Sequence, residues 1–167
     1  GSSTFSAITP MGRQHENDRE ATAADLKWLA DPTEEPEPFG DGGTKMAWNT
    51  FNVVSIYPNG NPVMSDVNQR WVGDCCACAV IASMAYLYPR FVKHIIKDNM
   101  DKTYTVTMYD PKGKQISVGV GGDYFIGNSG DLGALGGRNK EVTWATILEK
   151  AMIKWNQIYQ GSSNVGG

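Results

Sequence analysis

The sequence predicts an α+β fold that is mainly helical and carries a small antiparallel sheet. Three stretches support this prediction: an apolar helix over 75–88, two alternating runs over 104–120 and an amphipathic helix over 144–158. Apolar positions that recur every three or four residues indicate helices, whereas strict alternation indicates strands. With 167 residues, 41% of them hydrophobic, the chain can bury a single core.

The first 45 residues are expected to form a polar N-terminal arm, a short helix and an acidic linker. The helix is predicted over 22–30, with Leu26 and Leu29 facing inward. Residues 31–38 hold three prolines and three glutamates, which favours an extended linker or a plain surface loop.

Residues 46–167 are expected to form the core lobe. Its first stretch, 46–57, predicts a strand or extended segment, and a turn follows over 58–62. A helix is predicted over 90–99, and the glycine-rich stretch 121–140 predicts an irregular surface loop.

The two clearest elements lie in the second half of the chain. Alternating runs on either side of Asp-Pro-Lys-Gly at 110–113 predict a β-hairpin. In the last helix, Lys150 and Lys154 are expected outside the apolar face. That face contains Trp144, Ile147, Leu148, Ala151, Trp155 and Ile158.

Composition excludes several classes of function. The net charge is −3 and no run of lysine and arginine forms a basic stripe, which argues against nucleic-acid binding. No apolar run reaches eighteen residues, so no membrane span is expected, and no signal peptide is visible. The compartment, intracellular or exported, stays open.

Chemistry is concentrated where a cysteine meets the start of the apolar helix. Cys75 follows Gly73, which permits a tight turn, and Asp74, which can cap the helix. A thiol at a helix N-terminus faces unpaired N–H groups, which favour the thiolate. Gln69 can donate an amide N–H to the oxyanion that forms when this thiolate attacks a carbonyl. The helix has no polar face, so we expect it to be buried on all sides.

The cysteines allow other interpretations. All three lie within positions 75–78, which excludes a disulfide framework, and each can serve as a small buried apolar residue. Cys75 and Cys78 also have the C-x-x-C spacing of thiol-disulfide oxidoreductases, although no alternating β-α-β pattern surrounds them. A zinc site would need a second Cys/His pair, which the sequence lacks.

Two ordered motifs resemble the calpain family of papain-like cysteine proteases. Residues 66–83 contain the family's glutamine, its Gly-Asp-Cys at 73–75 and its Ala-x-Ile-Ala-Ser at 79–83. Residues 144–156 are similar to the family's Trp-led helix, and Gly166 with Gly167 match its closing glycines. The resemblance covers 66–167 and implies the mainly helical first lobe of a papain-like protease, with a central buried nucleophile helix.

The sequence departs from the family at two points. Cys76 stands where calpains have tryptophan after the nucleophile. The family's histidine base and orienting asparagine belong to a second lobe, and neither His15 nor His94 has the expected context. We therefore expect this lobe to work with a complementary lobe or chain that carries them, whether the chain was cut during processing or truncated at the lobe boundary.

The resemblance implies peptide-bond hydrolysis through a thioester, with protein or peptide as substrate. Cys75 is the implied nucleophile and Gln69 the implied oxyanion donor, while Gly73, Asp74, Gly166 and Gly167 are candidate substrate-binding residues. Two alternatives stay open: a noncatalytic papain-like binding module, and a C-x-x-C oxidoreductase.

No cofactor is required by this chemistry, but the family suggests calcium. In calpains this lobe binds calcium through an acid nine residues before the nucleophile and another just ahead of the Trp-led helix. Asp66 occupies the first position, whereas Val142 occupies the second and Glu141 is one residue away. Because calcium takes six to eight oxygen ligands, Asp66 and Glu141 would supply only part of a site.

Overall fold

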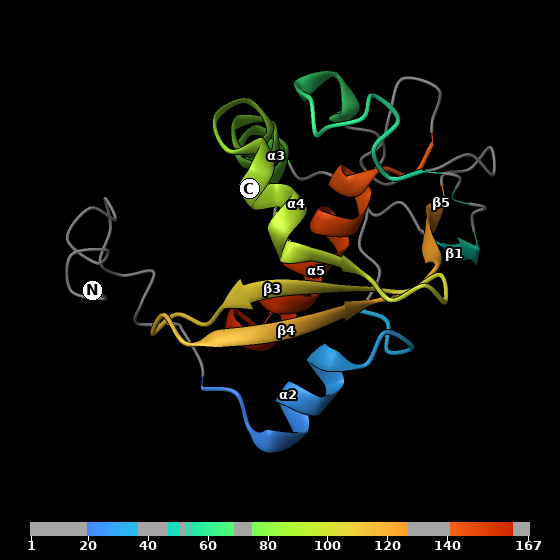
Figure 1. Ribbon diagram of the computed structural model, residues 1–167. Helices are drawn as coiled ribbons and strands as arrows, with labels where there is room; N and C mark the ends of the chain where they lie inside the picture. The colour runs from blue at the N-terminus through green and yellow to red at the C-terminus, as the bar shows by residue number, and fades with distance from the viewer. Residues whose placement is uncertain are drawn as a thin grey trace.

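The structure, a computed structural model, has the predicted α+β architecture, with helices around a small antiparallel sheet (Figure 1). It describes residues 20–36, 47–50, 53, 55–68, 75–126 and 141–161. The elements in chain order are α2 (Ala23–Ala30), β1 (Ala47–Thr50), η3 (Met64–Asp66), α3 (Cys75–Leu87), α4 (Pro89–Ile95), β2 (Ile96–Asp98), β3 (Tyr104–Tyr109), β4 (Gln115–Val120), β5 (Asp123–Ile126) and α5 (Trp144–Tyr159).

The predicted hairpin is confirmed. Strands β3 and β4 pair antiparallel, with Val106 opposite Val118. Their turn is closed by a 2.8 Å hydrogen bond from the Asp110 N–H to the Lys114 carbonyl, and Gly113 takes φ +86°, a conformation that favours glycine. Val106 and Val118 are fully buried, so one face of the hairpin lies on the core.

The helix predicted over 90–99 is shorter than expected. Helix α4 ends at Ile95, and the chain continues as strand β2, which adds a third strand beside β3. Ile96 lies opposite Val106 in that ladder and is buried. Pairing with the hairpin therefore overrides the helical pattern, because β-branched residues fit a half-buried strand well.

The interpretation of 121–140 as irregular is wrong at its start. Strand β5 pairs antiparallel with β1, with Trp48 opposite Phe125. Tyr124 in β5 is only 1% exposed, so the strand is anchored in the core. Among the described residues of the extended segment predicted over 46–57, Ala47–Thr50 form a strand, and residues 127–140 lie outside the described part of the chain.

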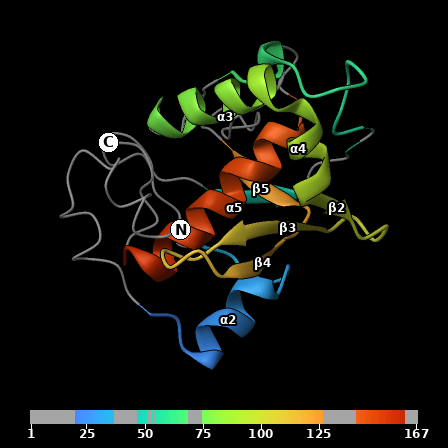
Figure 2. The ribbon, with the colours of Figure 1, turned by 60° about the vertical axis from the view of Figure 1, so that its left-hand side comes forward.

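Helix α5 forms the centre of the core. Figure 2 shows it between α3 and the β3–β4 hairpin, with α2 beyond β4. Ile147, Ala151 and Ile153 are completely buried, and Ile153 lies on a different side of the helix from the other two. The prediction that Lys150 and Lys154 lie outside is wrong, because their side chains are 3% and 0% exposed. The side of α5 that carries them is covered by other parts of the chain.

Helix α3 is not enclosed on all sides, contrary to the prediction. Ile81 and Ala85 are buried, where the helix packs against α5, α4 and η3. The opposite face is exposed, with Val80, Tyr86 and Leu87 more than half exposed. No described element covers that face, although the helix carries no charged residue. None of the described helices has both the length and the hydropathy needed to cross a membrane.

The predicted N-terminal helix is confirmed as α2. Thr22 caps it through a capping box with Asp25. Leu29 is completely buried as predicted, whereas Leu26 is exposed because it lies on the solvent side of this short helix. The end of α2 lies so close to β4 that a Cβ on Gly119 would be 2.4 Å from the Ala30 carbonyl oxygen. Residues 20–36 thus pack on the core, and a domain boundary at 45 stays a prediction.

Candidate functional site

Helix α3 begins at Cys75, which puts this residue in the first turn of a thirteen-residue helix. At that position a side chain lies near the positive end of the helix dipole. The side chains of residues 75–78 lie outside the described part of the structure, and so do five other predicted site residues. Those five are Gln69, Gly73, Asp74, Gly166 and Gly167.

Asp66 is the predicted site residue that the structure describes best. Its side chain is 2% exposed, and both carboxylate oxygens accept hydrogen bonds. Oδ1 accepts from Asn59 Nδ2 at 2.9 Å, while Oδ2 accepts from the Val63 N–H at 3.2 Å and from Trp144 Nε1 at 2.8 Å. Buried carboxylates are costly unless they are hydrogen-bonded, and these three donors satisfy Asp66.

The hydrogen bond from Trp144 joins the two sequence motifs. Asp66 opens the first motif and Trp144 opens the second, 78 residues later. The Trp144 backbone N–H also donates to the Ile56 carbonyl at 2.9 Å. This second hydrogen bond connects the start of α5 to the chain that precedes η3. Thr143 caps α5 by accepting from the Ala145 N–H. The start of α5 is therefore fixed by local and by long-range contacts.

The second candidate calcium ligand, Glu141, is half-buried, and its Oε2 is buried without a hydrogen bond among the described residues. Val142, at the family's second acidic position, is 5% exposed and offers no side-chain oxygen. Within the described ranges, no group of three or more His, Cys, Asp or Glu side chains is arranged to hold a metal.

Of the two histidines, His94 lies in the described part of the chain. His94 is exposed in the last turn of α4. His15 lies outside the described residues. A base for the Cys75 thiol is therefore not identified among the described side chains, and its supply by a second lobe stays a prediction.

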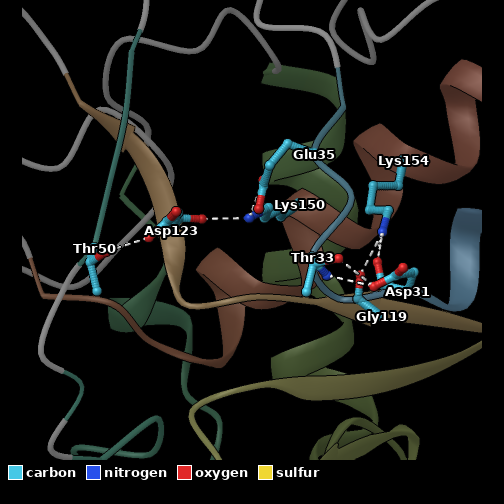
Figure 3. Close-up of polar contacts among 8 residues, drawn as sticks. All are labelled: Asp31, Thr33, Glu35, Thr50, Gly119, Asp123, Lys150 and Lys154. Atoms are coloured by element: carbon cyan, nitrogen blue, oxygen red, sulfur yellow. Dashed lines mark hydrogen bonds and ion pairs between the residues drawn. The ribbon is translucent and has the colours of Figure 1, made fainter.

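Sequence reasoning missed a cluster of buried polar contacts around the two lysines of α5 (Figure 3). Lys154 Nζ donates to the Asp31 carbonyl at 2.9 Å and to the Gly119 carbonyl at 2.8 Å, and lies 4.9 Å from the centre of the Trp28 ring. These contacts connect α5 at once to the residue after α2 and to strand β4.

Residues 31–36 follow α2, and we call them the strap. Lys150 lies one turn before Lys154 in α5 and also contacts the strap. Its Nζ is 2.6 Å from Glu35 Oε2 and donates to the Asp123 carbonyl at the start of β5. Asp123 in turn accepts a hydrogen bond from the Thr50 hydroxyl of β1 (Figure 3). One lysine thus links the strap, α5 and the two-stranded sheet.

Burial sets the protonation of this cluster. It lowers the pKa of Lys154 to about 8, and it lowers the pKa of Lys150 against the opposing pull of Glu35. Burial also raises the pKa of Glu35, although the charge of Lys150 acts in the opposite direction. Each partner is thus shifted toward its neutral form, as expected where desolvation outweighs attraction. Lys154 donates to two backbone oxygens, whereas Lys150 donates to one and pairs with the Glu35 carboxylate, so we interpret the cluster as an anchor for the strap.

A signal for this anchor existed in the sequence but is weak. Lys150 and Lys154 are four residues apart, so they lie on one side of a helix, and the only acidic proline-rich stretch of the chain could complement them. Lysine is so rarely buried that this spacing is ordinarily assigned to the solvent face.

The comparisons with known proteins leave the family open. No protein-family model matches the chain, and no curated protein matches it significantly.

Proposed function

We propose that this chain is the nucleophile-bearing lobe of a calpain-like cysteine endopeptidase. Cys75 attacks the scissile carbonyl of a protein or peptide substrate, and the oxyanion is stabilised by its own backbone N–H and by the Gln69 amide. A histidine from a complementary lobe or chain takes the thiol proton and returns it to the leaving amine, oriented by an asparagine. Water then hydrolyses the thioester.

The observation that carries the proposal is the hydrogen bond between Asp66 and Trp144. The two segments that resemble the family are distant in sequence, and the motif match alone says nothing of where they lie in space. The buried carboxylate of Asp66 connects the two motifs, so both contribute to the same tertiary contact. The start of α3 at Cys75 adds support, because a helix N-terminus is a known means of stabilising a thiolate.

Selective labelling of the thiols tests this function. The wild-type chain and three single variants, Cys75→Ala, Cys76→Ala and Cys78→Ala, are treated with a peptidyl epoxide and the labelled residue is located by peptide mass spectrometry. We expect Cys75→Ala to lose the label while the other two variants retain it. Intact-mass analysis of the purified protein also shows whether a second fragment that carries histidine and asparagine co-purifies.

The same experiment separates the alternatives. A thiol-disulfide oxidoreductase would interconvert between dithiol and disulfide, so Cys75→Ala and Cys78→Ala would be equally deficient in exchange with a small disulfide. A noncatalytic binding module would label slowly at all three cysteines. Normal labelling of the Cys75→Ala variant contradicts the assignment of the nucleophile.

A further inference from the structure

Helix α3 presents an apolar face to solvent, and this face continues onto α4. Val80, Ser83 and Leu87 follow one another at intervals of three and four residues, so they lie on one side of α3. Ile81 and Ala85, on the other side, are buried. The large apolar side chains exposed along the two helices are those of Val80, Tyr86, Leu87, Tyr88 and Phe91, and we call this surface the α3–α4 face.

The side chains of the α3–α4 face protrude from the molecule. Tyr86 is 74% exposed, Tyr88 61% and Leu87 57%. Figure 2 shows α3 and α4 along one outer edge of the molecule, with α2 on the other side of the β3–β4 hairpin. A groove that takes up a peptide is lined by partly buried walls, whereas protruding apolar side chains enter a lipid interface readily. The shape therefore favours a membrane surface over a peptide.

The charge of this surface favours an anionic occupant. Residues 79–97 contain three cations, Arg90, Lys93 and Lys97, and no aspartate or glutamate, although the whole chain has a net charge of −3. All three cations are exposed. Basic side chains beside an exposed apolar surface are attracted to anionic lipid head groups, and each cation adds to the affinity.

The polar atoms of the face are also suited to a lipid interface. The Ser83 hydroxyl donates to the Ala79 carbonyl at 2.9 Å, so it is already hydrogen-bonded when water leaves the helix. Tyr86 and Tyr88 each combine an apolar ring with a hydroxyl, and such side chains are enriched at the level of the head groups.

A second copy of the chain is a poorer occupant. In a two-fold dimer the same surface meets itself. Arg90 and Lys97 of the two copies would then approach each other without an acid between residues 79 and 97 to offset the repulsion.

We propose that the α3–α4 face binds the surface of an anionic lipid bilayer and does not cross it. The apolar side chains enter the boundary between head groups and acyl chains, while Arg90, Lys93 and Lys97 lie near the lipid phosphates. Leu87 ends α3, and Cys75 begins it about 18 Å away along the helix. The inference thus stands irrespective of the proposed function.

Flotation with lipid vesicles tests the proposal. The full chain is mixed with vesicles of phosphatidylcholine alone, or of phosphatidylcholine and phosphatidylserine in equal amounts. The test variant combines Leu87→Ser with Arg90→Glu. The matched control combines Leu26→Ser with Lys27→Glu, at exposed positions of α2 on the other side of the molecule. We expect the wild type and the control to bind the mixed vesicles equally, and the test variant to bind them at least about tenfold less.

Two further measurements separate the apolar from the electrostatic contribution. Val80→Asp puts an acid on a face that has none, and it should also weaken binding to the mixed vesicles. Wild-type binding should weaken in high salt and on phosphatidylcholine alone, because both remove the attraction between the cations and the lipid. The urea midpoints of all variants should stay close to that of the wild type, since the substituted positions are exposed.

Several results overturn the proposal. One is a wild type that does not float with the mixed vesicles, and another is equal binding by the test variant and the α2 control. An acidic protein becomes the occupant if the wild type binds soluble polyglutamate but not vesicles, and the test variant loses that binding. A second copy becomes the occupant if sedimentation equilibrium shows a dimer that Val80→Asp abolishes.

Discussion

Replacing Lys154 by methionine should change the pH dependence of stability in a defined direction. The lysine is completely buried, and burial lowers its pKa from 10.5 to about 8. A difference of about 2.5 units corresponds to about 3 kcal/mol between the two protonation states. That is the order of magnitude by which burial disfavours the charged ammonium below pH 8.

The direction in which stability changes with pH follows from proton binding. Between pH 8 and pH 10.5 the unfolded chain keeps the Lys154 proton while the folded chain releases it, so the unfolded state binds more protons and folding stability rises with pH. The unfavourable contribution is fully present below about pH 8 and is lost above about pH 10.5. Methionine has no such titration. The free energy of unfolding of the wild type should therefore rise relative to Lys154→Met by about 2 kcal/mol from pH 8 to pH 10.

Urea unfolding followed by tryptophan fluorescence and circular dichroism measures this difference. Cysteines and tyrosines titrate in the same range, but both proteins contain them, so their contributions cancel in the comparison. Lys97→Met, at an exposed position of β2, is the control for removing a lysine that is not buried. A wild-type advantage that stays flat or falls with pH would refute the assignment of Lys154 as a buried, desolvated amine.

Two further substitutions test the packing of the strap and of a buried hydroxyl. Gly119→Ala would put a methyl group 2.4 Å from the Ala30 carbonyl oxygen, so urea unfolding should show a loss of about 1–3 kcal/mol. Gly122→Ala, whose nearest contact would be at 3.4 Å, should cost less than about 0.5 kcal/mol, and equal losses would contradict the close approach of α2 to β4. Tyr57 has a buried hydroxyl without a hydrogen-bond partner among the described residues, and burial raises its pKa to about 12. Tyr57→Phe should therefore preserve stability or raise it by up to about 1 kcal/mol, and absorbance at alkaline pH should lose one late tyrosine transition; a clear loss of stability would reveal a partner.

Elements with local signals were predictable from the sequence. The last helix begins after the capping residue Thr143, and the hairpin turns at Gly113, where the backbone takes a positive φ. In each of these cases the residues that decide the structure lie within a few positions of the element.

Contacts between distant parts of the chain were not predictable. The carbonyl that receives Lys154 belongs to Asp31, 123 residues earlier, and β1 reaches its partner strand across 73 residues, as in the Thr50–Asp123 hydrogen bond. Periodicity assigns a lysine to solvent because it contains no information on which backbone oxygens will lie nearby. The candidate site follows the same division: motif order suggested Asp66, but not that Trp144 would donate to it.

The lysine anchor also determines which residues of the strap can change. Lys154 donates to the backbone oxygen of Asp31 and not to its carboxylate. This contact therefore depends on the position of the backbone and not on the side chain of residue 31. Lys150, in contrast, contacts the Glu35 side chain, which makes that acid specific. In homologues we would expect an acid to persist at position 35 and small residues at 119, whereas the choice of residue at 31 is set by its own hydrogen bonds to Thr33 and not by Lys154. The contact at position 31 thus depends on where the backbone lies, whereas the contact at position 35 depends on the side chain.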